Sequence, residues 1–331
     1  MPFPSDKEKR QAEYLGNRLS RNEKSLRKWI RGEEIDAVRL YDADIPEIPL
    51  AIERYGSAAE AALVLWLYER PYEKDEAEES AWLDLMAATA AEALALAPDQ
   101  VFTKTRKRMK GREQYERKSG KSREMIVREA GLSFRVNLSD YLDIGLFLDH
   151  RPARTALGRC SRGKRVLNLF SYTGAFSVHA AAGGAASVCS VDLSNTYLDW
   201  ASANFDLNGL PPSLHEEVRA DCSGFLEAAA RRKDAWDLIV CDPPTFSNSS
   251  MARADFDAVR DWPRLIDACA RILVPGGTIL FSTSARRLKL DPAAISLPCI
   301  DVSEASIPRD FRDRKIHRCW LLGDTSAIAL T

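Results

Sequence analysis

Short apolar runs alternate with longer amphipathic segments after residue 164, and this pattern predicts strands that alternate with helices. We expect strands at residues 166–170, 187–191, 236–241 and 278–284, with a shorter one ending near residue 220 and a helix at residues 256–273. Such alternation is typical of a parallel sheet built from βαβ units. Two further apolar runs, at residues 297–302 and 316–322, predict an antiparallel edge hairpin that brings the sheet to seven strands.

The first half of the chain has a different pattern, in which helices accompany a group of short strands. Residues 16–35 place apolar positions at helical spacing opposite a basic face, and residues 75–97 form an alanine-rich helical stretch. We expect short strands at residues 37–41, 50–55 and 62–68, and a hairpin over residues 125–128 and 133–138. The change of pattern near residue 145 predicts an α+β domain at residues 1–145 and an α/β domain at residues 146–331.

A basic segment stands out against a net charge of -1 for the whole chain. Residues 101–123 carry ten lysines or arginines against two glutamates, with Phe102 and Tyr115 interleaved. Contacts with phosphates supply most non-specific nucleic-acid affinity, so this segment is a candidate RNA-binding region, although a solvated loop would look the same. The candidate RNA-binding residues are Lys104, Arg106, Lys107, Arg108, Lys110 and Arg112.

Cysteine usage and hydropathy limit the compartment. The seven cysteines are scattered singly, which is typical of a reducing cytoplasm. No apolar run reaches the roughly 18 residues of a membrane helix, and the N-terminus lacks a signal-peptide core. The four histidines show no metal-ligand spacing. We therefore expect a cytoplasmic protein with no membrane span and no metal ion.

The segment DLIVCDPPTFSN, residues 237–248, ends a buried strand at an acid followed by two prolines. Prolines cannot donate to a sheet ladder, so the chain must leave the sheet at Asp242. Ligands of open α/β sheets bind beyond the carboxyl ends of the strands, which makes this turn a candidate active site, although a capping acid in a proline turn is the simpler alternative. The candidate catalytic residues are Asp242, Pro243, Pro244 and Phe246.

Acids also end the second and third strands of the sheet. Asp192 lies about twenty residues beyond the strand-to-helix turn NLFSYTGAFS, where dinucleotide folds hold ribose hydroxyls. The turn has a single glycine and no pyrophosphate cradle, so it favours S-adenosylmethionine (SAM) over NAD and excludes an NAD-dependent oxidoreductase. Asp221 would then approach the adenine amine, and Asp242 would lie near the transferable methyl group.

Several motifs together resemble one family. RLYDADIPE, TRKRMKG, VNLSDYLDIGLFLDHR, LNLFSYTGAFSVHAA, VDLSNTYLDWA, DPPTFSNS and IHRCWLL resemble the methyltransferase K half of the bifunctional large-subunit ribosomal RNA methyltransferase K/L, which methylates guanine N7. The resemblance implies a class I SAM-dependent methyltransferase fold, with a Rossmann-like seven-stranded sheet and a smaller N-terminal α+β domain that engages ribosomal RNA. It implies SAM binding through Asp149, Arg151, Asn168, Phe170, Thr173, Gly174, Asp192 and Asp221.

Two departures from the fused family members affect the expectation. The guanine-N2 methyltransferase half and its RNA-binding module do not precede this sequence, so we expect a free-standing version. The segment STSARRLKL, which follows the fifth strand, also differs from the fused enzymes. RNA contacts are therefore not carried over to that segment.

The methylated atom can be narrowed from the turn residues. Exocyclic-amine methyltransferases usually place an aromatic residue directly after the acid-Pro-Pro, whereas Thr245 intervenes here before Phe246. Cytosine-C5 methylation needs a cysteine nucleophile, but residues 282–284 at the end of the fifth strand are Ser-Thr-Ser. Guanine N7 carries a lone pair and no proton, so it needs no base, only positioning, with Phe246 as a stacking platform.

The expected function is thus guanine-N7 methylation of large-subunit ribosomal RNA. N7 lies in the deep, narrow groove of A-form RNA, so the target must be unpaired, extruded, or met before ribosome assembly is complete. A cytosine-C5 methyltransferase and a non-catalytic ribosome-assembly factor with a retained cofactor fold stay as alternatives.

Overall fold

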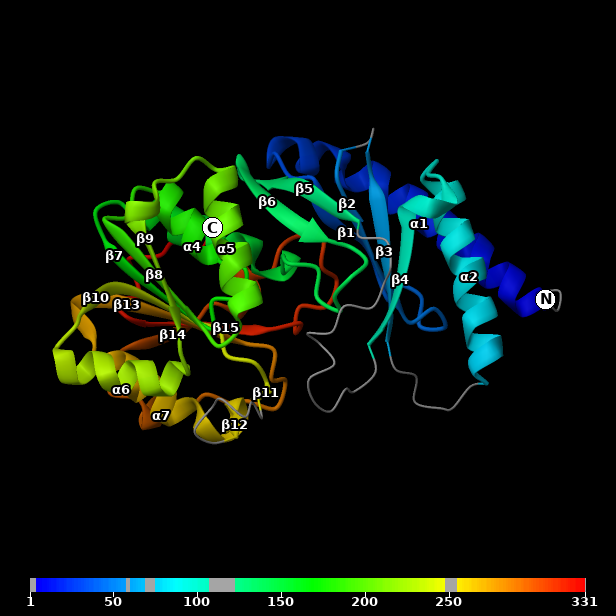
Figure 1. Cartoon of the computed structure of the whole chain (residues 1–331). Coiled ribbons are helices and arrows are strands. Elements are labelled where there is room, and N and C mark those ends of the chain that lie inside the picture. The colour runs from blue at the N-terminus through cyan, green and yellow to red at the C-terminus, as the bar shows by residue number, and fades with distance from the viewer. Residues whose placement is uncertain (1–3, 58–59, 69–74, 107–122, 248–254, 331) are drawn as a thin grey trace. The chain divides into compact units, whose positions relative to one another are not determined.

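The computed structural model describes residues 4–57, 60–68, 75–106, 123–247 and 255–330 (Figure 1). The chain divides into two compact units. The first contains Met1–Ile144 and Arg309–Arg312, and the second contains Gly145–Pro308 and Asp313–Thr331. Among the described residues, no helix combines the length and the apolar character that crossing a membrane would need.

Helix α1, Asp6–Gly32, opens the first unit. It begins ten residues before the predicted start, because Ser5 and Glu8 form a capping box that satisfies free amide groups of the first turn. Leu15, Leu19 and Leu26 lie on its buried face, and of these Leu19 and Leu26 are within the stretch whose helical spacing was predicted. The sequence prediction followed the basic stretch and overlooked this cap.

The sheet of the first unit has four strands in the order β1-β2-β3-β4. Their bounds are Ala37–Asp42, Leu50–Tyr55, Ala62–Tyr68 and Val101–Arg106. The first three strands are antiparallel and confirm the prediction, whereas β4 is parallel to β3 and was not predicted. Helix α2, Glu76–Ala93, makes the crossover that a parallel pair requires. Its Trp82 and Met86 join the buried cluster that α1 and the sheet also line.

A separate hairpin, also in the first unit, pairs β5 and β6. The strands are Glu124–Glu129 and Leu132–Asn137. Ala130 and Gly131 turn the chain with φ of 51° and 79°, in the left-handed region that two-residue hairpin turns use. The predicted hairpin and its turn are therefore confirmed.

The segment Arg309–Arg312 returns to the first unit through the motif RLYDADIPE. The backbone N–H of Arg39 donates to Asp310 Oδ2 (2.9 Å), and the Arg39 guanidinium stacks on the Phe311 ring 4.1 Å from its centroid. The backbone N–H of Arg312 donates to Asp42 Oδ2 (3.0 Å). We expected a second domain that ran unbroken from residue 146, and this return was not anticipated.

The second unit is built on a seven-stranded sheet in the order β14-β15-β13-β10-β7-β8-β9. In chain order the strands are β7 Arg165–Leu169, β8 Ser187–Asp192, β9 His215–Arg219, β10 Trp236–Cys241, β13 Leu273–Thr283, β14 Cys299–Asp301 and β15 Arg318–Gly323. The five neighbouring strands β9, β8, β7, β10 and β13 are parallel to one another. Strand β15 is antiparallel to both β13 and β14. The sequence prediction of seven strands with a terminal antiparallel pair is confirmed.

Helices cover both faces of this sheet, α6 and α7 on one face and α4 and α5 on the other (Figure 1). The helix bounds in the unit are α3 Arg151–Cys160, α4 Ala175–Ala182, α5 Asn195–Leu207, α6 Cys222–Arg232, α7 Ala258–Ala270 and α8 Ser303–Ser306. Buried residues of α6 and α7 form one core with β7, β10 and β13. The parallel arrangement brings the carboxyl ends of β7, β8, β9 and β10 to the same edge, where the candidate site lies.

Two details differ from the prediction. The helix expected at residues 256–273 is shorter, because β12, Phe256–Asp257, pairs with β11, Phe246–Ser247, before α7 begins. Strand β13 starts at Leu273 rather than after the glycines, and its register against β10 shifts between Trp236 and Leu238. The Val-Pro-Gly-Gly segment is thus accommodated as an irregularity within the strand.

Candidate functional site

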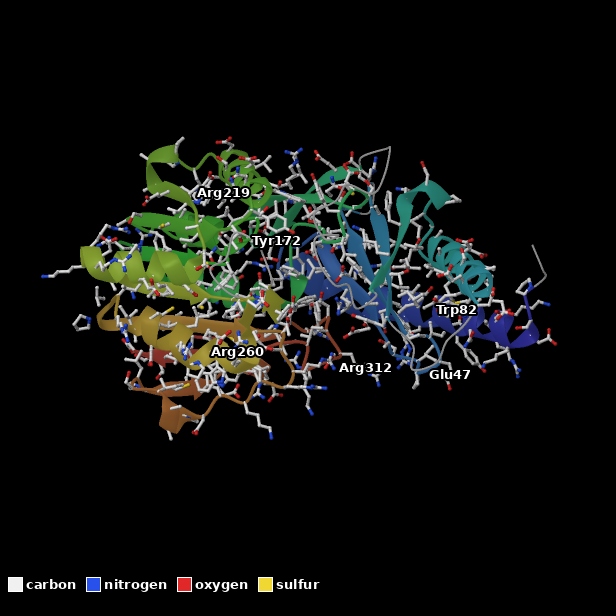
Figure 2. All side chains as sticks on the ribbon, turned by 60° about the horizontal axis from the view of Figure 1, so that its bottom comes forward. Glu47, Trp82, Tyr172, Arg219, Arg260 and Arg312 are labelled. Atoms are coloured by element: carbon white, nitrogen blue, oxygen red, sulfur yellow. The ribbon has the colours of Figure 1, made fainter. Side chains whose placement is uncertain are left out.

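The turn after β7 is held in an uncommon backbone conformation. Phe170, Tyr172 and Gly174 have φ values of 55°, 51° and 73°, in a region that side-chain-bearing residues adopt only when their surroundings enforce it. A Cβ on Gly174 would lie 2.7 Å from Ala201 Cβ of α5, so the glycine is required by helix packing as well as by φ. Tyr172 is labelled in Figure 2. Strained turns of this kind cluster at ligand sites.

Asp192, at the end of β8, fastens this turn. Its Oδ2 accepts the backbone N–H of Tyr172 (2.9 Å), and its Oδ1 accepts that of Ser194 (2.9 Å). Burial raises the pKa of Asp192, while hydrogen bonds from backbone amides act in the opposite direction. The acid therefore shapes the loops on both sides of the position where a ribose was predicted.

Asp221 stands at the end of β9 and caps α6, because its Oδ2 accepts the backbone N–H of Gly224 (2.9 Å). The next residue, Cys222, accepts the backbone N–H of Phe170 through its sulfur (3.3 Å). The structure thus brings together Phe170, Asp192 and Asp221, three residues predicted to bind the cofactor, through contacts between the loops after β7, β8 and β9.

The side chains of two other predicted cofactor residues form hydrogen bonds within the protein. Thr173 Oγ1 donates to the carbonyl of Gly145 (2.5 Å), and Asn168 Nδ2 donates to Ser177 Oγ (2.9 Å). Both side chains are fully or almost fully buried. Cofactor binding by the Asn168 and Thr173 side chains stays a prediction, and the structure gives each of them another partner.

Ser171 was not among the predicted site residues, yet its environment indicates a ligand. Its side chain is buried, and its Oγ has no hydrogen-bond partner among the described residues. A buried hydroxyl without a partner is costly, so its place beside the Asp192-fastened turn fits a polar ligand. The donor and acceptor set here suits the ribose and amino groups of SAM.

At the end of β10, Asp242 begins the predicted methyl-transfer turn. The Ser282 hydroxyl of β13 donates to Asp242 Oδ1 (2.6 Å), and His150 Nε2 lies 3.4 Å from Asp242 Oδ2. Pro243 and Pro244 carry the chain out of the sheet, as predicted. Phe246 is 54% exposed, so its aromatic ring is accessible for stacking.

A histidine pair that sequence reasoning did not connect lies next to Asp242. His150 and His317 stack with centroids 4.3 Å apart and an interplanar angle of 9°. His317 Nδ1 is 2.8 Å from Asp149 Oδ2, and its Nε2 is 2.8 Å from Ser306 Oγ. His317 is 167 positions from His150 in the chain, and only the IHRCWLL motif marked its region. Arg151, another predicted cofactor residue, begins α3 and is buried.

Asp149, His150 and His317 could in principle be read as a metal site, since their ligand atoms lie within 4.8 Å of one another. Ring nitrogens coordinate a metal through lone pairs in the ring plane. In two nearly parallel stacked rings these lone pairs run side by side and do not converge on one ion. The direct 2.8 Å contact between His317 and Asp149 accounts for the cluster as a hydrogen-bonded network.

The predicted RNA-binding residues are only partly described. Lys104, in β4, donates through its ammonium to the carbonyls of Tyr141 and Leu142 and lies 5.5 Å from the centroid of the Trp66 ring. Arg106 ends the same strand. Lys107, Arg108, Lys110 and Arg112 lie outside the described residues.

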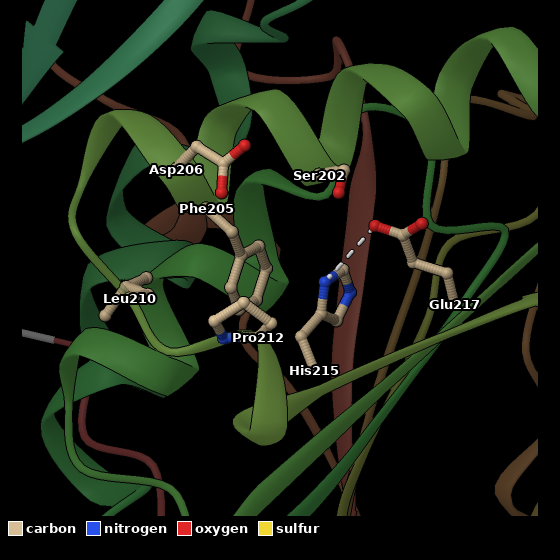
Figure 3. A pocket seen from close by; sticks show the side chains of 7 residues that line it. All are labelled: Ser202, Phe205, Asp206, Leu210, Pro212, His215 and Glu217. Carbon is tan, nitrogen blue, oxygen red and sulfur yellow. Dashed lines mark ion pairs between the residues drawn. The ribbon is translucent and has the colours of Figure 1, made fainter.

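A small hollow of about 150 Å³ lies elsewhere in the second unit (Figure 3). It is lined in part by Phe205, His215 and Glu217, and the His215 ring stacks on Phe205 with centroids 3.7 Å apart. Burial lowers the pKa of His215 to about 4. His215 begins β9, so the hollow is at the amino ends of the strands and separate from the acids at their carboxyl ends.

Comparisons with known proteins agree with this geometry. The family described as S-adenosylmethionine-dependent methyltransferase matches residues 59–295. The chain is 45% identical over 307 residues to Ribosomal RNA large subunit methyltransferase K of Neisseria meningitidis serogroup B, a match that covers 92% of this chain and 86% of the relative.

Two solved structures are similar over 94% of this chain and 81% of theirs. A methyltransferase in complex with SAH has a TM-score of 0.74 at 25% identity, and a SAM-dependent methyltransferase from Streptococcus mutans has a TM-score of 0.71 at 24% identity. The second likeness concerns the fold alone. The fold, the fastened turn after β7 and these matches lead to one conclusion: the chain belongs to the S-adenosylmethionine-dependent methyltransferase family.

Proposed function

We propose that the protein transfers a methyl group from SAM to N7 of a guanine in large-subunit ribosomal RNA, as in the K half of K/L enzymes. The observation that carries this proposal is the environment of Asp242, whose Oδ1 accepts the hydroxyl of Ser282 from the end of β13 (2.6 Å). A serine thus stands at the strand end where a cytosine-C5 enzyme would hold its nucleophilic cysteine. The name of the Neisseria relative supports ribosomal RNA as the substrate.

In this proposal, one group of residues would bind the cofactor and another would bind the target base. SAM supplies an electrophilic methyl group on a sulfonium. Asp192 and Asp221 would hold the ribose and adenine parts, while Asp242 and the exposed Phe246 would orient the guanine. Because N7 attacks with its own lone pair, this chain has to position the base and exclude water, and it needs no proton acceptor.

Cysteine chemistry gives a further argument against the cytosine-C5 alternative. Cys241 directly precedes Asp242 in β10, Cys319 of β15 pairs with Ser282 of β13, and both cysteines are fully buried. Burial raises the pKa of each thiol, which disfavours the thiolate that would attack cytosine C6. A buried thiol of this kind behaves as a small apolar side chain.

The test is methylation in vitro with labelled SAM, using naked large-subunit RNA and assembled large subunits in parallel. We expect transfer to naked RNA, weaker transfer to assembled subunits, and 7-methylguanosine after digestion. Labelled 5-methylcytidine would show that the methylated atom is cytosine C5, and labelled N2-methylguanosine would show that it is guanine N2. An absence of transfer to either RNA would contradict the proposed substrate.

Cofactor binding can be tested at Asp192. Asp192→Asn places an amide NH2 against the N–H groups of Tyr172 or Ser194 and removes a ribose acceptor. Losing a hydrogen bond to a charged group raises the Kd for SAM by about 10- to 100-fold, measured by calorimetry. Asp199→Asn, at an exposed position of α5, is the matched control and should bind as the unchanged protein does. Equal affinities for both variants would exclude Asp192 from the site.

Helix α1 offers a surface for the RNA backbone. Positions three and four residues apart form a solvent-exposed stripe of five cations, one tyrosine and one asparagine, about 32 Å long, with no acid on it. Its residues are Arg10, Tyr14, Asn17, Arg21, Lys24, Lys28 and Arg31. The whole chain carries a net charge of -1, so this stripe is a local feature that fits phosphates.

We expect the triple variant Arg21→Gln, Lys24→Gln, Lys28→Gln to bind RNA more weakly and with a shallower salt dependence. Each lost phosphate contact lowers the slope of log K against log salt by about 0.7 to 0.9. Filter binding at several salt concentrations measures this. The control neutralises Arg231, Lys233 and Arg271, which are exposed in the second unit. The same loss in both variants would mean that general charge, and not α1, determines the affinity.

A further inference from the structure

The His150 ring is fixed on two sides. It stacks on His317 at 4.3 Å and 9°, and it meets the Phe176 ring edge-on, with centroids 5.8 Å apart at 63°. The partner ring is itself anchored, because His317 contacts Asp149 and Ser306 through its two nitrogens. His150 is only 6% exposed, so it has little freedom to take another orientation.

The fixed ring meets one oxygen of Asp242. His150 Nε2 lies 3.4 Å from Oδ2, while the Ser282 hydroxyl occupies Oδ1. The two carboxylate oxygens therefore have different protein contacts, and both contacts come from buried side chains. A carboxylate oxygen has two lone pairs, so each oxygen can still accept a hydrogen from a bound base.

The proton position on the imidazole follows from its surroundings. The charged and titratable groups that face His150 are Asp149, Asp242, His317 and Arg154, and burial lowers the pKa of His150. A neutral ring has one N–H. Nε2 lies 3.4 Å from Asp242 Oδ2 and 3.9 Å from Asp149 Oδ2, so an N–H placed there faces two carboxylates with Asp242 the nearer, whereas a lone pair there would repel both. Nδ1 then bears the lone pair, and it is buried without a hydrogen-bond partner among the described residues.

We propose that His150 is a positioning residue for methyl transfer: its Nε2–H holds Asp242 Oδ2 so that the carboxylate faces the base in one orientation. This deepens the proposed function, on which it rests. Guanine presents N1–H and N2–H donors side by side, and a carboxylate with one lone pair left on each oxygen matches this edge. Fixing Asp242 thus fixes the guanine, and with it the line from N7 to the methyl group.

The test compares His150→Gln with His150→Asn in the full-length protein. Glutamine places its amide nitrogen near the original Nε2, whereas asparagine places its own nearer to Nδ1. We expect the glutamine variant to keep most of its kcat. The asparagine variant should lose about 10- to 100-fold in kcat, because even a small misplacement of the reacting groups slows the reaction by that much. The Kd for SAM, measured by calorimetry, should stay unchanged in both.

Equal losses in the two variants would reduce His150 to a packing residue, and a larger loss for glutamine would move its role to Nδ1. Nitrogen NMR of the four histidines tests the tautomer without any RNA. We expect His150 as the neutral Nε2–H form, and an Nδ1–H form would overturn the proposal. If the wild-type enzyme methylates another atom, the proposed function fails, whereas the Gln and Asn contrast and the tautomer still decide the role of His150.

Discussion

Asp242→Asn is expected to lower kcat by about 10²- to 10³-fold, because removing one preorganised polar group from an active site costs that much. The amide removes the negative charge and turns one acceptor into a donor. That donor would face either the Ser282 hydroxyl or His150 Nε2, both of which contact the carboxylate in the native protein. Single-turnover methylation of RNA measures the loss, and calorimetry shows whether SAM still binds.

The matched control for Asp242 is Asp237→Asn at the other end of the same strand. Asp237 accepts a hydrogen bond as Asp242 does, but from the backbone N–H of Arg165 to its Oδ2 (2.8 Å) and at the amino end of β10. We expect this variant to keep its kcat. The Asp242→Asn gene can also be expressed in a strain that lacks this protein. If it restored both ribosome assembly and the methylated nucleoside, the catalytic assignment would be contradicted. Normal assembly without the modification would support an additional, non-catalytic role in assembly.

Glu53→Ala is expected to destabilise the first unit by about 3 to 5 kcal/mol, the cost of removing one partner from a buried ion pair. Glu53 accepts the Arg39 guanidinium (2.8 Å), the Tyr55 hydroxyl (2.8 Å) and the Trp66 indole N–H (2.7 Å), and all four side chains are buried. Urea unfolding measures the change. Glu47→Ala is the control, since Glu47 is exposed (Figure 2) and its loss should change the stability by less than about 0.5 kcal/mol.

The Glu53 network also predicts a pH dependence. Burial alone raises the pKa of Glu53, but the Arg39 charge and hydrogen bonds from Arg39, Trp66 and Tyr55 outweigh it and leave the pKa lowered. A carboxyl whose folded pKa is lowered stabilises the protein above its unfolded pKa of about 4.3, and this stability is lost as the pH falls through the folded value. The difference in unfolding free energy between wild type and Glu53→Ala should therefore be constant near neutrality and shrink below about pH 4.3. A difference that grows in acid would contradict the assignment.

The second unit was predictable where local signals agreed with the fold. The apolar run before Asp242 and the two prolines after it defined both the end of β10 and the candidate turn. Asp192 and Asp221 were recognisable for the same reason, because Asp192 is the last residue of β8 and Asp221 comes two residues after the end of β9. Local pattern sufficed there because parallel strands bring successive carboxyl ends to one edge.

The missed features depend on pairing that no local pattern records. Strand β4 was hidden because its Val101–Arg106 residues open the basic segment, and charge dominated the interpretation over β-branched and aromatic positions. The return of Arg309–Arg312 to the first unit joins Asp310 to Arg39 across 271 positions. His317 became a site residue only because β15 inserts between β13 and β14 and pairs with β13 in the antiparallel direction, which places the start of β15 beside the carboxyl end of β13.

The most direct test of the account is mass analysis of nucleosides from large-subunit ribosomal RNA of a strain that lacks this protein. The account predicts the loss of one 7-methylguanosine, its return with the wild-type gene, and no return with Asp242→Asn. Loss of 5-methylcytidine or N2-methylguanosine, with 7-methylguanosine unchanged, would contradict guanine N7 as the methylated atom.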